Sequence, residues 1–247
     1  MHHAGLVSIS FRENTPEEIV KACVAVGLRY IEWGSDVHAP CNDPEKLEHI
    51  VQLHQKYGVS CCSYGTYFRL GITPVEELPA YIRAAKILGT NVLRLWVGDK
   101  SPWKWTQEEK EALFADSRRA AKIAEQEGVI LCMECHRMTF TETKESAMEL
   151  MQAVDSHAFR MYWQPHQTQP IEENIAYAKM LKDYTVNVHV LHWKDKDKLS
   201  LEEGIEEWRS YIKELPGERF VLLEHMPDHK IESLERETNA LRKILAP

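Results

Sequence analysis

Residues 106–136, TQEEKEALFADSRRAAKIAEQEGVILCMECH, contain one complete copy of the unit that the chain repeats. Thr106 is followed by two acids where a helix would make its first turn, a pattern typical of a capped helix start. Gly128 can end that helix in a left-handed conformation. The apolar, β-rich run Val129–Cys135 then predicts a strand. The stretch therefore predicts a helix followed directly by a buried strand.

The same unit recurs along the whole chain. Helix starts of the same kind occur at Thr15, Asp43 and Ser200, two of them with Pro at the first helical position. Strands that alternate with helices form parallel sheets, and eight units in about 250 residues favour a closed barrel. The predicted fold class is α/β, a (β/α)8 TIM barrel that forms one domain over residues 1–247. The eight predicted strands are Leu6–Phe11, Tyr30–Gly34, Val59–Tyr64, Val92–Gly98, Val129–Cys135, Arg160–Gln164, Val186–Trp193 and Phe220–His225.

Composition and charge exclude several classes of protein. The 247 residues are 44% hydrophobic and 28% charged, which is ordinary for a globular protein. The longest apolar run, Val129–Met133, is far short of the ~18 residues that a membrane helix needs. No apolar signal region precedes Arg12, so we expect a cytoplasmic protein with no membrane partner. The formal net charge of −8 disfavours a nucleic-acid partner. The turn at residues 12–15 has no glycine, which argues against a dinucleotide-binding fold.

Polar residues stand at the ends of four successive predicted strands. Glu134, Gln164, His189 and Glu224 are each about one β/α unit apart, so a barrel would deliver them to the same rim. A carboxylate inside an apolar strand is costly to bury unless it is paired or bound to a metal. Two carboxylates, an imidazole and an amide oxygen suit one divalent cation with open positions. The alternative is that each is an ordinary, hydrogen-bonded polar residue of a barrel rim.

Aromatic and basic residues gather at the same predicted rim. Four tryptophans end strands, and together they predict an aromatic-walled pocket of the size of a small carbohydrate. For any single tryptophan, packing at the end of the barrel is the alternative. Arg69, Arg94 and Lys194 could hold a substrate phosphate or carboxylate, or form salt bridges at the rim. The four tryptophans are Trp33, Trp96, Trp163 and Trp193.

Short motifs occur in order, one in each of seven predicted units. They are Ile31–Gly34 (IEWG) with His38, Ser63–Arg69 (SYGTYFR), Arg94–Gly98 (RLWVG), Glu134–His136 (ECH), Tyr162–Pro165 (YWQP), Asn187–Trp193 (NVHVLHW) and Leu223–His225 (LEH). In this order the chain resembles the sugar phosphate isomerase/epimerase superfamily, the xylose-isomerase-like barrels to which the second family of apurinic endonucleases is related. The resemblance covers essentially the whole chain.

The resemblance implies one divalent cofactor ion, Mn, Mg, Co or Zn, held by Glu, Asp, His and Glu from the ends of strands 5 to 8. Glu134, His189 and Glu224 match this pattern. Gln164 stands where Asp is usual, which should weaken metal binding because an anion is replaced by a neutral oxygen. His192 is an alternative ligand, since the sequence from His192 resembles the family's His-x-Lys-Asp pattern. The strand period places residues 189 and 192 on opposite faces, and His189 is preferred.

The resemblance also implies proton transfer next to a carbonyl through an enediolate, with Glu134 and Glu224 as the catalytic pair. We therefore expect a sugar or sugar phosphate isomerase or epimerase whose partner is a small carbohydrate; assembly into a homo-oligomer stays open. The alternatives are a metal-dependent dehydratase of a polyol or keto-acid, or a sugar-binding barrel without catalysis. The candidate substrate-binding residues are His38, Tyr67, Arg69, Trp96, His136, His166, His192 and Lys194.

Overall fold

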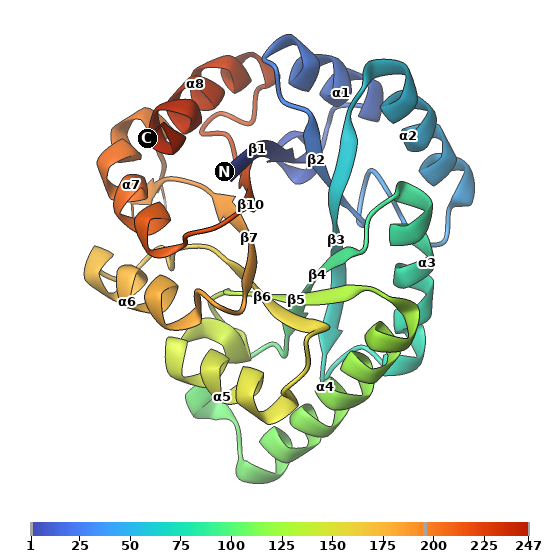
Figure 1. Cartoon of the computed structure of the whole chain (residues 1–247), viewed down its shortest axis with the longest axis vertical. Coiled ribbons are helices and arrows are strands. Elements are labelled where there is room, and N and C mark those ends of the chain that lie inside the picture. Colours follow the sequence, from blue (N-terminus) through green and yellow to red (C-terminus); the bar gives the residue numbers. More distant parts are fainter. Residues whose placement is uncertain (1, 195–196, 247) are drawn as a thin grey trace.

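Eight parallel strands are hydrogen-bonded in a closed ring, which Figure 1 shows nearly end-on. The structure, a computed structural model, describes residues 2–194 and 197–246, and the strands are counted within these ranges. Neighbours in the ring follow the chain order, and the last strand pairs with the first. The predicted (β/α)8 barrel is therefore confirmed. The strands are β1 (His2–Val7), β2 (Tyr30–Gly34), β3 (Ser60–Leu70), β4 (Val92–Val97), β5 (Ile130–Glu134), β6 (Phe159–Trp163), β7 (Thr185–Val190) and β10 (Arg219–Leu223).

Eight α-helices of the described part surround the ring (Figure 1). Thr15 and Thr106 each accept from the backbone of the third helical residue, whose Glu side chain bonds back to them, so both form capping boxes. Gly128 ends its helix with φ +67°, a conformation that glycine adopts without strain. The helices are α1 (Pro16–Ala25), α2 (Pro44–Tyr57), α3 (Leu78–Leu88), α4 (Gln107–Glu127), α5 (Lys144–Val154), α6 (Ile171–Leu181), α7 (Ile205–Glu214) and α8 (Leu234–Leu245).

Several predicted element boundaries are wrong. The predicted first strand continues to Phe11, but pairing with β2 ends at Val7, and Ser8–Phe11 form a 3-10 turn. The predicted seventh strand continues to Trp193, whereas β7 ends at Val190, where its pairing with β10 also ends. Beyond it, β8 (Trp193–Lys194) pairs antiparallel with β9 (Asp197–Lys198). Strand ends depend on the partner strand, which a local pattern does not show.

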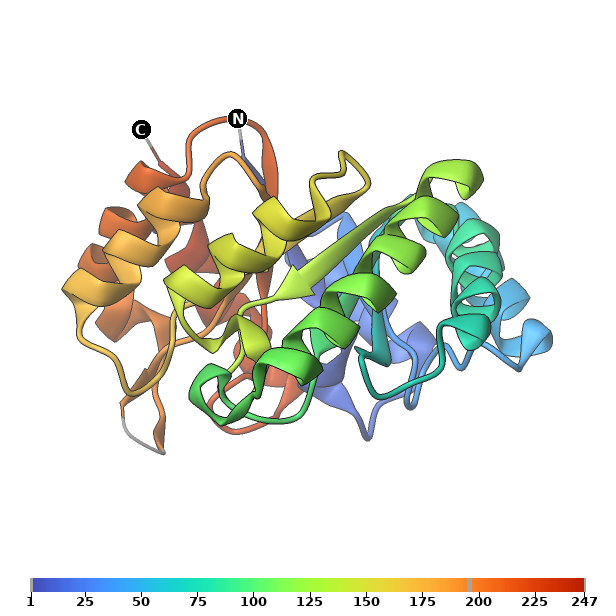
Figure 2. The same cartoon turned by 90° about the horizontal axis from the view of Figure 1, so that it is seen from below.

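Two smaller differences lie at the third strand and the seventh helix. β3 continues to Leu70, well past the predicted end at Tyr64. Ser200 accepts from the backbone of Glu202, but it caps a 3-10 turn, Leu201–Gly204, and α7 begins only at Ile205. The end of β3 and the 3-10 turn before α7 both lie at the carboxyl end of the barrel. This end lies opposite the start of β1 and the end of α8 (Figure 2).

The barrel interior divides into an apolar and a polar half along the strand direction. Val92, Cys132, Tyr162 and Leu222 are buried in one apolar cluster. The residue two positions later in each strand lies on the same face, one step nearer the carboxyl end, and there it is polar or charged. Gly5 belongs to the apolar half, because a Cβ there would lie 2.6 Å from Leu222 Cδ2. None of the described helices is long and apolar enough to cross a membrane.

Candidate metal centre

Two carboxylates and an imidazole meet at the carboxyl end of the barrel. Glu134 is the last residue of β5, His189 lies near the end of β7, and Glu224 directly follows β10. His189 Nδ1 lies 3.4 Å from Glu134 Oε1 and 3.6 Å from Glu224 Oε2. One ligand atom from each residue lies within 4.8 Å of the others. We call these three buried residues the acid–imidazole cluster.

Gln164 lies against this cluster from the end of β6. Its Nε2 donates to Glu134 Oε1 and to the Cys135 carbonyl oxygen, each at 3.0 Å. Its Oε1 is buried without a hydrogen-bond partner in the described structure, and so are Glu134 Oε2 and His189 Nδ1. Of these three atoms, Glu134 Oε2 faces Arg94 and His189 Nδ1 faces two carboxylates at salt-bridge distance, whereas Gln164 Oε1 has neither kind of partner, which is unusual for a buried polar atom. These oxygen and nitrogen donors fit a divalent cation, and the residues present are therefore suited to hold one.

A second layer of charged groups lies behind the cluster. The fully buried carboxylate of Glu32, from β2, places Oε1 3.2 Å from His189 Nε2. The Arg94 guanidinium, from β4, reaches Glu32 Oε1 at 3.7 Å and Glu134 Oε2 at 3.3 Å. Ser63 Oγ donates to Glu32 Oε2 at 2.5 Å. Arg94 was predicted either to hold an anionic group of a substrate or to form a salt bridge, and the structure shows salt bridges to Glu32 and Glu134. Glu32 has no role among the sequence-based predictions, although a charge inside an apolar strand was a signal for one.

In this interior, neighbouring opposite charges shift the pKa values of the buried groups more than burial itself does. Burial raises the pKa of Glu134 and of Glu32, but nearby Arg94 and His189 outweigh it, and both pKa values are lowered. Burial lowers the pKa of His189, but the carboxylates of Glu224 and Glu32 outweigh it and raise that pKa to about 10. In the absence of a metal the imidazole therefore holds a proton among the acids. A cation that binds Nδ1 would displace that proton.

Four predicted substrate-binding residues form a wall beside the cluster. The centre of this wall is the ring of Trp96 from β4. Around it lie Tyr67 and Arg69 from β3 and His136 after β5, and we call these four residues the tryptophan wall. The Arg69 guanidinium lies 4.4 Å from the ring centroid, Tyr67 5.0 Å and His136 5.7 Å. Trp96 Nε1 is buried without a partner in the described structure. Arg94 connects the wall to the cluster, because it lies 4.8 Å from the Trp96 ring and pairs with Glu134.

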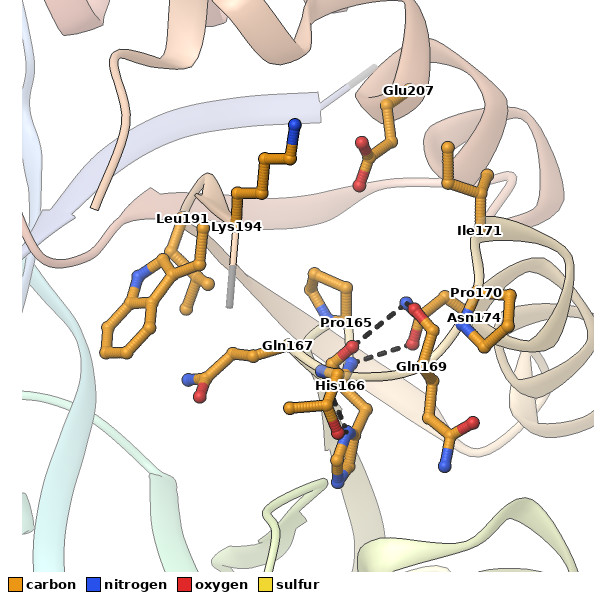
Figure 3. A pocket seen from close by; sticks show the side chains of 12 residues that line it. Pro165, His166, Gln167, Gln169, Pro170, Ile171, Asn174, Leu191, Lys194 and Glu207 are labelled. Atoms are coloured by element: carbon orange, nitrogen blue, oxygen red, sulfur yellow. Dashed lines mark hydrogen bonds between the residues drawn. The ribbon is translucent and has the colours of Figure 1, made fainter. Parts of the chain in front are cut away.

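Other predicted substrate-binding residues make contacts outside the cluster. Both ring nitrogens of His38 are engaged, by Ser8 Oγ and by the Asn14 carbonyl oxygen. His166 and Lys194 line a cavity of 330 Å³ (Figure 3), and no residue of the cluster lines it. The roles of these residues stay predictions.

His192, the alternative ligand, is not part of the acid–imidazole cluster. A Cβ built on Gly204 would lie 2.5 Å from His192 Nδ1, so the His192 ring rests against that backbone. Asp195, the last residue of the motif that begins at His192, lies outside the described residues. Within these residues it is His189 that the fold brings to Glu134 and Glu224.

Solved structures share this fold along nearly the whole chain. A probable 3-DHS dehydratase, AsbF, from Bacillus anthracis is 18% identical with a TM-score of 0.81, and 98% of each chain is covered. The IolI protein with a bound zinc atom is 16% identical with a TM-score of 0.78, again over 98% of each chain. A D-allulose 3-epimerase from Methylomonas sp. is 13% identical with a TM-score of 0.76 and the same coverage. These likenesses show the fold alone.

Sequence comparison is more specific about the family. No curated protein matches the chain. The family model described as xylose isomerase-like TIM barrel matches residues 20–244, which include the whole acid–imidazole cluster. The chain therefore belongs to the xylose isomerase-like TIM barrel family.

Proposed function

We propose that the protein is a metal-dependent isomerase or epimerase of a sugar or sugar phosphate, which moves a proton at the carbon next to a carbonyl. The observation that carries this proposal is the approach of Glu134 and Glu224 to one atom, His189 Nδ1, which has no hydrogen bond in the described structure. Proteins of the same fold include a D-allulose 3-epimerase and a zinc-bound protein, which supports this kind of reaction and of cofactor.

The ion would be held by Glu134, Gln164, His189 and Glu224. Mn, Mg, Co and Zn all accept this oxygen-rich set with one nitrogen. When bound, the ion would draw electron density from the carbonyl and hydroxyl oxygens of the substrate, which acidifies the hydroxyl-bearing carbon next to the carbonyl and stabilises an enediolate. The unpaired oxygen of Gln164 and the unpaired Nδ1 of His189 support these two residues as ligands.

The two glutamates would carry the proton. In the ring, β5 and β10 are separated by β6 and β7, so Glu134 and Glu224 approach the site from different sides. The lowered pKa of Glu134 keeps it ionised near neutral pH, as a general base must be. Delivery of a proton by the second glutamate to the opposite face of the same carbon, while the first keeps the proton that it removed, gives epimerisation. Return of the removed proton to the neighbouring carbon gives aldose–ketose isomerisation.

The tryptophan wall would contact the rest of the substrate. The Trp96 ring packs against the guanidinium groups of Arg69 and Arg94 and can hold them at the site, and its unpaired Nε1–H can donate to a hydroxyl group. Arg69 and His136 add polar groups at the edge of this wall. Such a wall of an aromatic face with a few polar groups is typical of a small-carbohydrate site.

The test is isotope exchange. Metal-loaded protein is incubated in deuterated water with a panel of ketoses and their phosphates, and proton NMR follows the carbon next to the carbonyl. We expect deuterium at that carbon in the true substrate. The variants Glu134→Gln and Glu224→Gln should lower the rate at least ~10²-fold, the usual scale for a lost general base. Glu237→Gln on α8 is the control, because Glu237 is equally buried but outside the barrel.

Metal content must be measured in each variant, since both glutamates are also proposed ligands. Turnover without exchange, and without intramolecular transfer of a label placed at that carbon, would contradict the enolisation. An ultraviolet-absorbing enone product would identify a dehydratase, which begins with the same proton abstraction. Exchange with none of the sugars, together with tight sugar binding, would identify a binding protein.

A further inference from the structure

We propose that Glu32 is a positioning residue for the metal centre: its carboxylate holds the His189 ring in the tautomer that presents Nδ1 to Glu134 and Glu224. The inference rests on the proposed metal site but not on the proposed reaction. Nothing in the proton transfer uses Glu32, yet its carboxylate is fully buried. A buried carboxylate opposes folding by several kcal/mol unless it is well paired. Its partners therefore show what it does.

The local structure of two strands turns Glu32 and Ser63 toward each other. In the pairing of β2 with β3, Ile31 lies opposite Cys61 but Glu32 lies opposite Ser63, so Cys62 is an extra residue. Such an irregularity changes the alternation of side chains along a strand. Cys62 lies in the apolar cluster of the interior, and Ser63 Oγ donates to Glu32 Oε2. This hydrogen bond fixes one oxygen of the carboxylate.

The other oxygen of Glu32 is directed at His189. Glu32 Oε1 lies 3.2 Å from His189 Nε2, which has no other hydrogen-bond partner among the described residues. The Tyr162 ring packs on the imidazole with the centroids 4.3 Å apart, and its hydroxyl lies 3.1 Å from Ser63 Oγ. The ring of His189 is thus held at one edge by Glu32 and on one face by Tyr162.

The tautomer follows from which nitrogen faces which carboxylate. Nδ1 faces Glu134 and Glu224, so it is the nitrogen that would hold the ion, and the ion would take the place of the proton there. The one proton that the imidazole then keeps stands at Nε2, where Glu32 Oε1 accepts it. With the proton at Nε2, the lone pair on Nδ1 binds the cation, and the hydrogen bond to a carboxylate increases its basicity. Without Glu32, no carboxylate accepts the Nε2 proton, and neither the tautomer nor the orientation of the ring is fixed.

The experiment measures metal affinity, which needs no substrate. Metal-free wild type, Glu32→Gln and the control Glu237→Gln are titrated calorimetrically with Mn²⁺, Co²⁺ and Zn²⁺. Glu32→Gln keeps the shape of the side chain but removes the charge, and we expect ions to bind it 10- to 100-fold more weakly, the usual effect of losing such an outer partner. Glu237 accepts hydrogen bonds from Leu201 N and Ser200 Oγ on the outside of the barrel, so its variant should bind metal as wild type does.

A second readout separates positioning from a general effect on the fold. The visible spectrum of bound Co²⁺ depends on the number and kind of ligands, so it should differ between wild type and Glu32→Gln. A structural role alone would lower the melting temperature of the metal-free protein and leave affinity and spectrum unchanged. Unchanged affinity and spectrum in a folded Glu32→Gln protein would overturn the inference while the metal site stands.

A different variant covers the case that Glu32→Gln does not fold. Ser63→Ala removes the hydrogen bond that orients Glu32 but keeps the negative charge, and metal should bind it several-fold more weakly. Wild-type affinity in Ser63→Ala would then overturn the inference. A wild-type protein that binds none of the three ions would overturn both the metal site and the role of Glu32.

Discussion

The two halves of the barrel interior differ in chemistry although the same strands form them. Four strands carry an apolar or weakly polar residue and, two positions later on the same face, a polar or charged one. The pairs are Val92 and Arg94, Cys132 and Glu134, Tyr162 and Gln164, and Leu222 and Glu224. The apolar half, which we call the lower half, packs as an ordinary hydrophobic core. The polar half at the carboxyl end, which we call the upper half, buries three glutamates, an arginine and a histidine that are stabilised by one another.

This difference shows that packing and chemistry are separated along the strand axis. Each buried side chain of the lower half stabilises the fold in proportion to its apolar area. Buried ion pairs often contribute no more than a hydrophobic replacement would, but removing one partner is strongly destabilising. The upper half is therefore a set of mutually dependent charges. Substitutions in the upper half should change the free energy of unfolding by an amount that depends on added metal, and they should alter the site. Substitutions in the lower half should change only the free energy of unfolding, with or without metal.

The largest expected effect breaks the charge balance of the upper half. Arg94→Met removes one of the two buried cations, Arg94 and His189, that face Glu32 and Glu134, and it should lower the free energy of unfolding by about 3–5 kcal/mol in a chelating buffer. Urea denaturation at neutral pH measures this. A divalent ion should restore part of the loss, because it supplies positive charge beside Glu134. A loss below about 1 kcal/mol would mean that the charges do not depend on one another.

The matched change in the lower half is Leu222→Ala. Leu222 is fully buried, two residues before Glu224 on the same strand. The lost apolar contacts and the cavity should lower the free energy of unfolding by about 2–4 kcal/mol. Urea denaturation with and without metal should give the same difference from wild type. A metal-dependent difference would show that the two halves are coupled.

A third substitution, at His54 on α2, tests for a loss of stability at acid pH that arises outside both halves of the barrel interior. Trp33 Nε1 donates to His54 Nε2 on α2 at 2.8 Å, and burial lowers the pKa of His54 from 6.5 to about 4. The unfolded chain therefore takes up a proton near pH 6.5 and the folded protein only near pH 4, so stability falls as the pH drops between these values. The loss at pH 5 should be about 2 kcal/mol.

His54→Gln tests this, because an amide oxygen can accept the same hydrogen bond without titrating. Its urea midpoint should vary less between pH 7 and pH 5 than that of wild type. If the two proteins depend on pH equally, the acid sensitivity arises elsewhere in the molecule.

The smallest expected effect concerns Gln164, the amide among the proposed ligands of the upper half. Gln164→Asp should tighten metal binding about tenfold, or about 1.4 kcal/mol, because a carboxylate replaces an amide facing a dication. Calorimetric titration measures the affinity. Gln164→Asn is the control, since it shortens the side chain equally without adding charge, and it should bind metal more weakly than wild type. If the Asp variant is the weaker one, Gln164 is not a ligand.

The sequence predicted the barrel because its helix starts, stops and apolar strands are local signals. It misplaced strand ends at Val7 and Val190, since these depend on where β2 and β10 cease to pair. It brought Glu134, His189 and Glu224 together because each stands at the end of a predicted strand. It assigned nothing to Glu32, whose contacts depend on the extra residue in β3 and on a partner across the barrel. A local sequence pattern shows neither an irregular strand pairing nor a contact across the barrel.

The closure of the ring has a consequence for how the protein is made. β10 is the last strand to be synthesised, and it joins the barrel by pairing with β1, the first. Glu224 follows β10, so a growing chain on the ribosome cannot complete the acid–imidazole cluster until every strand of the barrel has been translated. Chains that end before β10 present at most scattered members of the proposed ligand set. At the proposed metal site, the capture of an ion would therefore coincide with the closure of the barrel.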